Sequence, residues 1–231
     1  MEKIKKQLYK YKHAWLFSYF LLYLPWFFYL EQRKHVSYIS VHMPLDDCIP
    51  FCEYFIIPYL LWFAYIATGM LYLFFTDKKG FYRCCAILYA GMTICLLIYT
   101  FFPNAQALRP AVLESDSIFA KWVENIYRSD TPTNVCPSIH VFNSIGLFLC
   151  LWQNKKCQKH KAVLLSCGVL TVSICLSTMF LKQHSCVDVF YGTLLALILY
   201  TLVYKVNYQH AIEGLRNWSI DWEPNKHTEN E

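Results

Sequence analysis

Charged side chains are scarce in this chain of 231 residues. Asp, Glu, Lys and Arg together make up only 16% of the sequence, while hydrophobic residues make up 56% and aromatic residues 18%. So few charges cannot cover the surface of a small soluble globule. The composition therefore excludes that class and indicates an integral membrane protein.

The chain also has no internal repeat, no glycine-rich linker and no low-complexity block, and it contains only 7 glycines. We therefore expect one membrane domain over residues 1–231, made of a basic segment 1–13, a six-helix bundle 14–206 and a polar tail 207–231. No small-residue cleavage site follows the first apolar stretch, where the charged run 31–34 comes instead. We interpret this stretch as a retained anchor and not as a secretory signal.

Six apolar stretches follow one another along the chain. Most of them approach the ~20 residues that an α-helix needs to cross ~30 Å of hydrocarbon. They predict an all-α bundle of six transmembrane helices, with the fourth as the shortest. The predicted spans are 14–30, 54–75, 84–102, 139–152, 162–181 and 187–206.

Basic residues indicate how the bundle is oriented. They gather in 3–12 before the first helix, in 78–83 and in 155–161. By the positive-inside rule, both termini and these two connections are cytoplasmic, and the other connections are extracytoplasmic. We expect a multi-pass protein of the plasma membrane. Topology and anionic cytoplasmic lipids then explain the net charge of +5, so nucleic-acid binding is not implied.

The third connection, 103–137, is too long to be a simple turn. Within it, apolar residues recur at helical spacing between Ile118 and Tyr127, with Lys121 and Glu124 on the opposite side. This pattern predicts an amphipathic helix in addition to the six spans. A lid at the outer leaflet and a helix simply packed on the bundle fit the pattern equally well.

His184 and Asp188 are separated by four positions where the fifth connection enters the last span. At this spacing both side chains share one helix face. A carboxylate bonded to one ring nitrogen leaves the other nitrogen free, which is the usual arrangement for a histidine that acts as a nucleophile or base. A structural pair that caps the helix is the alternative.

Two more segments carry groups that suit phosphate. His140 follows Pro137 and Ser138 at the predicted start of the fourth span, where free backbone N–H groups attract anions. Arg109, followed by a proline, offers a guanidinium for bidentate phosphate binding. Each segment also has an ordinary interpretation, as a helix start and as a charge in a wet loop.

Taken together, the order and spacing of these segments resemble the type-2 phosphatidic acid phosphatase superfamily, whose pattern is Lys-x6-Arg-Pro, Pro-Ser-Gly-His and Ser-Arg-x5-His-x3-Asp. The resemblance implies that His184 attacks phosphorus, Asp188 orients it and His140 protonates the leaving alkoxide. It also implies that Arg109 and Ser138 hold the phosphoryl oxygens. A lipid phosphate would be the substrate, membrane lipids the surroundings, and neither a cofactor nor a metal would be needed.

The chain departs from this pattern at three positions. Phe102 stands where the family has lysine, Thr178 where it has arginine and Ile139 where it has glycine. We include Thr178 in the phosphate-binding set together with Lys182, which could restore one charge or could instead snorkel to the interface. The departures resemble the inositol phosphorylceramide and sphingomyelin synthase branch, in which a lipid alcohol accepts a phospho-headgroup. We favour the phosphatase, with such a phosphotransferase as the alternative.

A metal site is a further alternative, because Cys136, His140, His184 and Cys186 have residue types that bind zinc. A non-catalytic membrane protein would leave the order of the motifs unexplained. A disulfide among the outward cysteines is possible, but the sequence does not pair them. In the first outward connection we interpret His42, Asp46 and Asp47 as parts of a solvated loop. The outward cysteines are Cys48, Cys52, Cys136 and Cys186.

Overall fold

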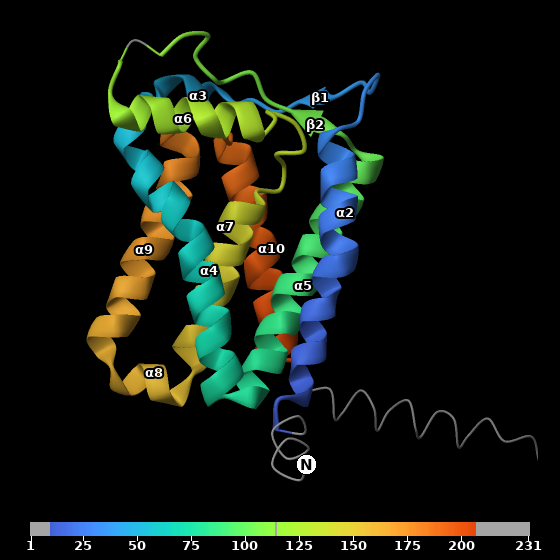
Figure 1. Ribbon diagram of the computed structural model, residues 1–231, viewed down its shortest axis with the longest axis vertical. Helices are drawn as coiled ribbons and strands as arrows, with labels where there is room; N and C mark the ends of the chain where they lie inside the picture. Colours follow the sequence, from blue (N-terminus) through green and yellow to red (C-terminus); the bar gives the residue numbers. More distant parts are fainter. Residues whose placement is uncertain (1–9, 114, 207–231) are drawn as a thin grey trace, which may run out of the picture.

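The computed structural model of the protein describes residues 10–113 and 115–206, which are mostly helical as predicted (Figure 1). The predicted tail 207–231 and most of the basic segment 1–13 lie outside these described residues. The elements are the 3-10 helices Lys12–Tyr19 and Glu53–Phe55, the strands β1 (Ile39–Ser40) and β2 (Asn104–Ala105), and the α-helices α2 (Phe20–Glu31), α3 (Pro44–Cys48), α4 (Ile56–Thr76), α5 (Lys78–Phe101), α6 (Ile118–Ser129), α7 (Ile139–Gln153), α8 (Lys155–Lys159), α9 (Lys161–Phe180) and α10 (Cys186–Tyr204).

Four helices within the described residues are long and apolar enough to cross a membrane. They are Glu53–Thr76, Lys78–Phe101, Lys161–Phe180 and Cys186–Tyr204. The first predicted span differs because a 3-10 helix precedes α2, and Pro25 inside α2 removes one backbone N–H donor. The fourth, α7, has only 15 residues. The structure thus supports a membrane protein, and the count of six spans stays a prediction.

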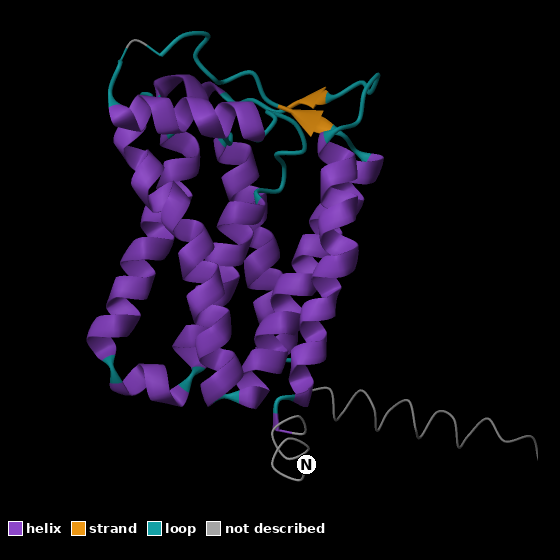
Figure 2. Cartoon of the chain, viewed as in Figure 1, coloured by secondary structure: helices purple, strands orange, loops and turns teal. Residues whose placement is uncertain are grey.

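The long helices run side by side, and shorter elements cover the two ends of the bundle (Figures 1 and 2). At one end, α3, α6 and the β1–β2 pair lie across the helix ends, while α8 crosses the other end. The two strands pair in parallel, with Ile39 opposite Asn104 and Ser40 opposite Ala105. This short pair is the departure from the all-α expectation. The orientation of the ends relative to a membrane stays a prediction.

Helix α7 lies at the centre of the bundle and contacts α4, α5, α9 and α10. Its Phe142 and Leu147 are fully buried. Gly192 brings α10 close to the start of α7, because a Cβ atom at this glycine would lie 2.8 Å from the carbonyl oxygen of Ser138. No larger residue fits this approach without a backbone shift. This close contact positions α10 against the start of α7, near the end of the bundle that α3 and α6 cover.

Helix α6 occupies the predicted segment of the third connection. It places Val123 in a buried cluster with Ile56, Tyr59 and Leu181, which belong to α4 and the end of α9. Ile118 and Trp122 remain exposed. In this structure α6 is therefore packed on the end of the bundle, and a role as an amphipathic membrane element stays a prediction.

Asn104 holds the rest of the third connection in place. Its side-chain oxygen accepts hydrogen bonds from the backbone N–H groups of Val135 and Cys136, both at 2.8 Å, and its amide donates to the carbonyl of Cys136 at 3.0 Å. The Cys136–Pro137 peptide bond that follows is cis. Asn104 thereby anchors the backbone directly in front of α7, where Ser138 and His140 lie.

Candidate active site

His184 and Asp188 contact each other as their spacing predicts. Nδ1 of His184 lies 3.2 Å from Oδ2 of Asp188, and this oxygen also accepts the backbone N–H of Ser185 at 2.9 Å. Asp188 is fully buried and His184 is 8% exposed. With Asp188 ionised, Nδ1 carries the proton and Nε2 keeps a free lone pair. The capping alternative also holds, since Ser185 and Asp188 form the capping box of α10.

The structure brings His140 next to His184, with ring centroids 5.8 Å apart. His140 lies in the first turn of α7 and stacks on Tyr59 at 4.8 Å, with Trp62 at 4.4 Å on the same side chain. Both aromatic residues come from α4. His140 comes from α7 and His184 from the turn between α9 and α10, so the fold brings together two imidazole rings from distant parts of the chain.

Ser138 ties the two helices together at this point. Its backbone N–H donates to the carbonyl of Asp188 at 3.1 Å, and its hydroxyl accepts the N–H of Val141 at 3.4 Å as the N-cap of α7. Ser138 is fully buried. Its hydroxyl is thus engaged in the cap and takes up the N–H of Val141, so the N–H groups of Ile139 and His140 are the ones in this turn that an anion could use.

Arg109 is fixed by the end of α6. Its Nη1 donates to the carbonyls of Asp130 at 2.8 Å and Tyr127 at 3.2 Å, and its guanidinium carbon lies 4.5 Å from the ring centre of Tyr127. Carbonyls at a helix C-terminus attract a cation. On the other side, Nη2 donates to Oε1 of Gln183, whereas the buried Nε has no hydrogen-bond partner.

Gln183 is a site residue that the sequence analysis missed. It directly precedes His184 and is 3% exposed. Because its oxygen accepts from Arg109, its Nε2 must point away, and this buried donor has no partner either. Two unpaired N–H donors thus sit on contacting residues beside His184. A phosphoryl oxygen would satisfy donors of this kind.

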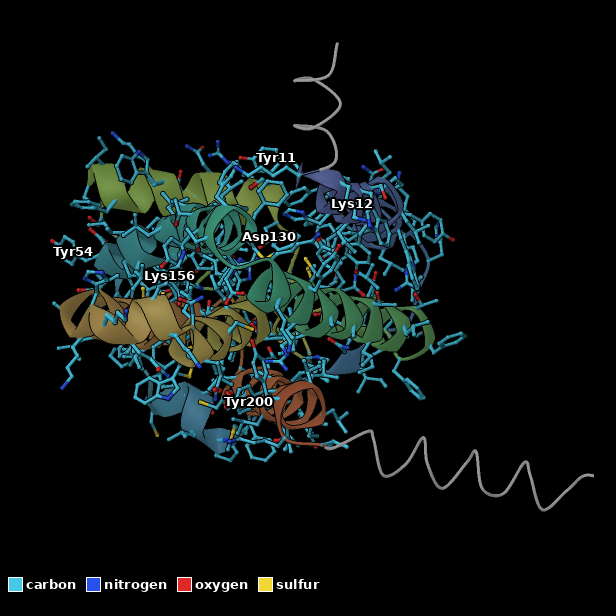
Figure 3. The ribbon with its side chains drawn as sticks, turned by 90° about the horizontal axis from the view of Figure 1, so that it is seen from below. Tyr11, Lys12, Tyr54, Asp130, Lys156 and Tyr200 are labelled. Atoms are coloured by element: carbon cyan, nitrogen blue, oxygen red, sulfur yellow. The ribbon has the colours of Figure 1, made fainter. Side chains whose placement is uncertain are left out.

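Asp130 is a second residue that the sequence analysis missed. Its Oδ2 accepts a hydrogen bond from Tyr59 at 3.3 Å. Burial raises the pKa of Asp130, and the neighbouring His184 and Arg109 offset part of that rise. In the view along the bundle, Asp130 lies near the middle, whereas Tyr54 lies at the edge (Figure 3). The site therefore holds a carboxyl group besides Asp188.

A family model, that of the PAP2 superfamily, matches residues 84–211, which is more than half of the chain. The protein belongs to the PAP2 superfamily. The matched range contains every site residue predicted from the sequence. No curated protein and no solved structure matches the chain.

Membership in the PAP2 superfamily and the apolar helices fit a membrane lipid phosphatase or a related phosphotransferase. Lipid phosphates and membrane lipids are the partners that the family implies. The narrower likeness to inositol phosphorylceramide synthases is not confirmed and stays a prediction.

In this PAP2 protein, Thr178 and Lys182 make contacts that do not involve the two histidine rings. The Thr178 hydroxyl donates to the carbonyl of Cys175 at 2.8 Å, while its own carbonyl accepts the N–H groups of Gln183 and His184. Nζ of Lys182 donates to the carbonyl of Asp46 at 2.7 Å. Thr178 thus shapes the turn through its backbone, and Lys182 fastens that turn to α3. Their roles in binding phosphate stay predictions.

Asp46 is not part of a solvated loop, so that expectation is wrong for this residue. It is 2% exposed, and its carboxylate accepts hydrogen bonds from the Ser185 hydroxyl at 2.6 Å and the Cys186 N–H at 2.8 Å. Burial alone would raise the pKa of Asp46, but these hydrogen bonds outweigh it and lower the pKa. His42 and Asp47 form an exposed pair at 3.0 Å. Asp46 thereby holds the start of α10 beside His184.

The cysteines give no support to the zinc alternative. All eleven lie within the described residues and are free thiols, so the structure contains no disulfide among them. Burial and the nearby Asp188 raise the pKa of Cys136 to about 12, which keeps this thiol protonated. Within residues 10–113 and 115–206, no three His, Cys, Asp or Glu side chains gather as metal ligands would.

Proposed function

We propose that this PAP2 protein is a lipid phosphate phosphatase that works through a phosphohistidine at His184. The observation that carries the proposal is the buried Asp188 bonded to Nδ1 of His184, with the His140 ring 5.8 Å away. This pairing leaves Nε2 of His184 free to act as the nucleophile, and the nearby His140 ring could serve as the general acid. It is the arrangement expected for nucleophilic catalysis assisted by a general acid.

In the first step, the Nε2 lone pair of His184 forms a bond to phosphorus. The bond between phosphorus and the lipid oxygen breaks, and its electron pair stays on that oxygen, which takes a proton from His140. In the second step, water attacks phosphorus and gives a proton to His140. The phosphorus–nitrogen bond breaks, its electron pair returns to Nε2, and phosphate leaves.

The phosphoryl oxygens would be held at the junction of three segments. Arg109 and Gln183 contribute the unpaired donors Nε and Nε2, and the start of α7 contributes its first-turn N–H groups behind Ser138. Such preorganised donors stabilise the negative charge that spreads over the oxygens in the transition state. No metal ion is required in this scheme.

Headgroup transfer to a lipid alcohol is the second candidate, and the charge of the site favours it. Phe102 and Thr178 replace two basic residues of the family pattern, and Asp130 adds a carboxyl group near Arg109. A phosphodiester carries one negative charge and so needs fewer cations than a phosphomonoester. In this case a lipid hydroxyl would take the place of water in the second step.

The test measures phosphate release by the purified full chain from phosphatidic acid, ceramide 1-phosphate and isoprenyl pyrophosphate. We expect release by the wild type, none by His184→Ala, and full release by Asp47→Ala, which alters an exposed residue. An alkali-stable label on the protein that disappears in His184→Ala would identify the intermediate. Transfer of a labelled headgroup from a phospholipid donor to diacylglycerol or ceramide, without release of free phosphate, would establish headgroup transfer instead. Full activity of His184→Ala would refute both candidates.

A further inference from the structure

An apolar cavity of about 490 Å³ lies beside the candidate active site, between α2, α4, α5 and α7. Its walls are mostly aliphatic and aromatic, with Phe20, Ile66 and Met92 among them. Its volume falls within the range of pockets that bind small organic ligands, ~300–1,000 Å³. A cavity of this kind suits hydrocarbon.

The cavity is open at the outer face of the bundle and reaches inward to Trp62, which contacts His140. On the outer side it is bordered by Leu24, Phe63 and Leu71, which are 44%, 58% and 46% exposed. On the inner side it is lined by Trp62, whose ring lies 4.4 Å from that of His140, and by Asn143. A chain entering from the lipid would therefore end next to the general acid.

Asn143 is a buried polar residue in the otherwise mostly apolar lining of the cavity. It lies three residues after His140 on α7, hence one helical turn deeper in the bundle, and it is 3% exposed. Its side-chain oxygen has no hydrogen-bond partner. Thr171, another buried polar residue of the helices, is paired with the Tyr65 hydroxyl at 3.0 Å. An unpaired amide oxygen in a buried helix is costly, which points to a ligand group as the partner.

Trp62, which also lines the cavity, carries a second unpaired polar atom, Nε1. The Asn143 oxygen can only accept a hydrogen bond, and the Trp62 nitrogen can only donate one. A hydroxyl or an amide group offers both a donor and an acceptor. A polyprenyl chain offers neither, and the ester groups of a diacylglycerol offer acceptors alone.

We propose that this cavity binds the hydrocarbon part of the lipid substrate and that Asn143, together with Trp62, recognises a hydroxyl or amide group on the lipid backbone. The proposal rests on the proposed function in one respect, because it places the phosphate of the same lipid at His184. The substrates would then be lipid phosphates whose backbone carries a hydroxyl or amide group, such as ceramide-type phosphates.

Binding is measured with the full chain carrying His184→Ala in lipid nanodiscs, so that turnover does not interfere. Fluorescent ceramide 1-phosphate is the probe, and unlabelled ceramide 1-phosphate and farnesyl phosphate are the competitors. Adding Asn143→Leu should weaken ceramide 1-phosphate about tenfold and change farnesyl phosphate less than about twofold. Ala67→Trp, at the mouth of the cavity, should weaken both ligands. Ala64→Trp, on the same helix outside the cavity, should weaken neither.

Equal effects of Asn143→Leu on both ligands, or no effect, would overturn the proposal. The thermal midpoint of Asn143→Leu separates recognition from damage to the fold, since removing an unpaired polar group should not lower it. A lower midpoint would indicate a structural role for Asn143 and would also overturn the proposal. Phosphate release is assayed separately with the wild type. Absent release combined with the expected binding pattern would therefore refute only the proposed function.

Discussion

Replacing Gln183 by leucine tests the phosphate site most directly. The side chain keeps about the same volume, but the unpaired Nε2 donor and the oxygen that accepts from Arg109 are both lost. A hydrogen bond to a charged group contributes about 1.5–3 kcal/mol. Because the phosphoryl oxygens gain negative charge in the transition state, we expect kcat/KM to fall about 10- to 150-fold.

The assay follows initial rates of phosphate release over a range of lipid concentrations, next to thermal unfolding of the same preparation. Gln106→Leu is the matched control, since Gln106 is also buried but its Nε2 donates to the carbonyl of Lys182 at 2.9 Å. Gln106→Leu loses hydrogen bonds to the carbonyls of Lys182 and Gln183 and from the N–H of Leu108, so it should lose more stability than Gln183→Leu, which loses the one bond from Arg109. A kcat/KM of Gln183→Leu within twofold of the wild type would refute the role of Gln183. So would a loss of activity matched by an equal loss of folded protein.

Three other substitutions probe the supports of the site. Gly192→Ala should destabilise the protein by about 1–3 kcal/mol, because its Cβ would press on the Ser138 carbonyl, and an unchanged thermal midpoint would contradict that approach. Asp46→Asn removes a carboxylate whose pKa is lowered by folding. The substitution should therefore lower the free energy of unfolding above the unfolded pKa, and this loss should disappear as the pH falls through the folded pKa. Thermal unfolding of both proteins between about pH 3 and 7 measures it. Asp130→Asn should stabilise the protein at neutral pH, since burial raises the pKa of Asp130 and disfavours its charged form, and the gain should fade in acid; a pH-independent difference would argue against ionised Asp130.

The part of the site that depends on local spacing could be predicted from the sequence. The part that depends on contacts between distant segments could not. His184 and Asp188 lie four positions apart at the start of α10, so their contact could be predicted from their spacing although His184 itself precedes the helix. Asp46 reaches Ser185 across 139 positions, and Arg109 reaches Gln183 across 74. Neither pair follows a helical period, so no pattern in the chain signals it.

The helices show the same division between local pattern and tertiary context. Apolar length predicts α4, α5, α9 and α10 well, because crossing a membrane demands it. It also predicts the short fourth stretch 139–152, which α7 matches to within one residue, but it does not reveal that the first stretch splits into a 3-10 helix and α2. The polar residues Ser138 and Asn154 flank this apolar stretch and stand at the two caps of α7, so cap residues and hydropathy indicate the same ends.

The attachment of Arg109 to α6 has a consequence for turnover. The guanidinium is held by the carbonyls of Tyr127 and Asp130 at the end of that helix, and the Tyr127 hydroxyl donates to the carbonyl of Leu181 at 2.7 Å, three residues before His184. A displacement of α6 would therefore carry the guanidinium away from the phosphoryl group and pull on the nucleophile's turn at once. Movement of α6 and weaker binding of the phosphate product would then occur together, so the rate of phosphate release would depend on the rate at which α6 moves.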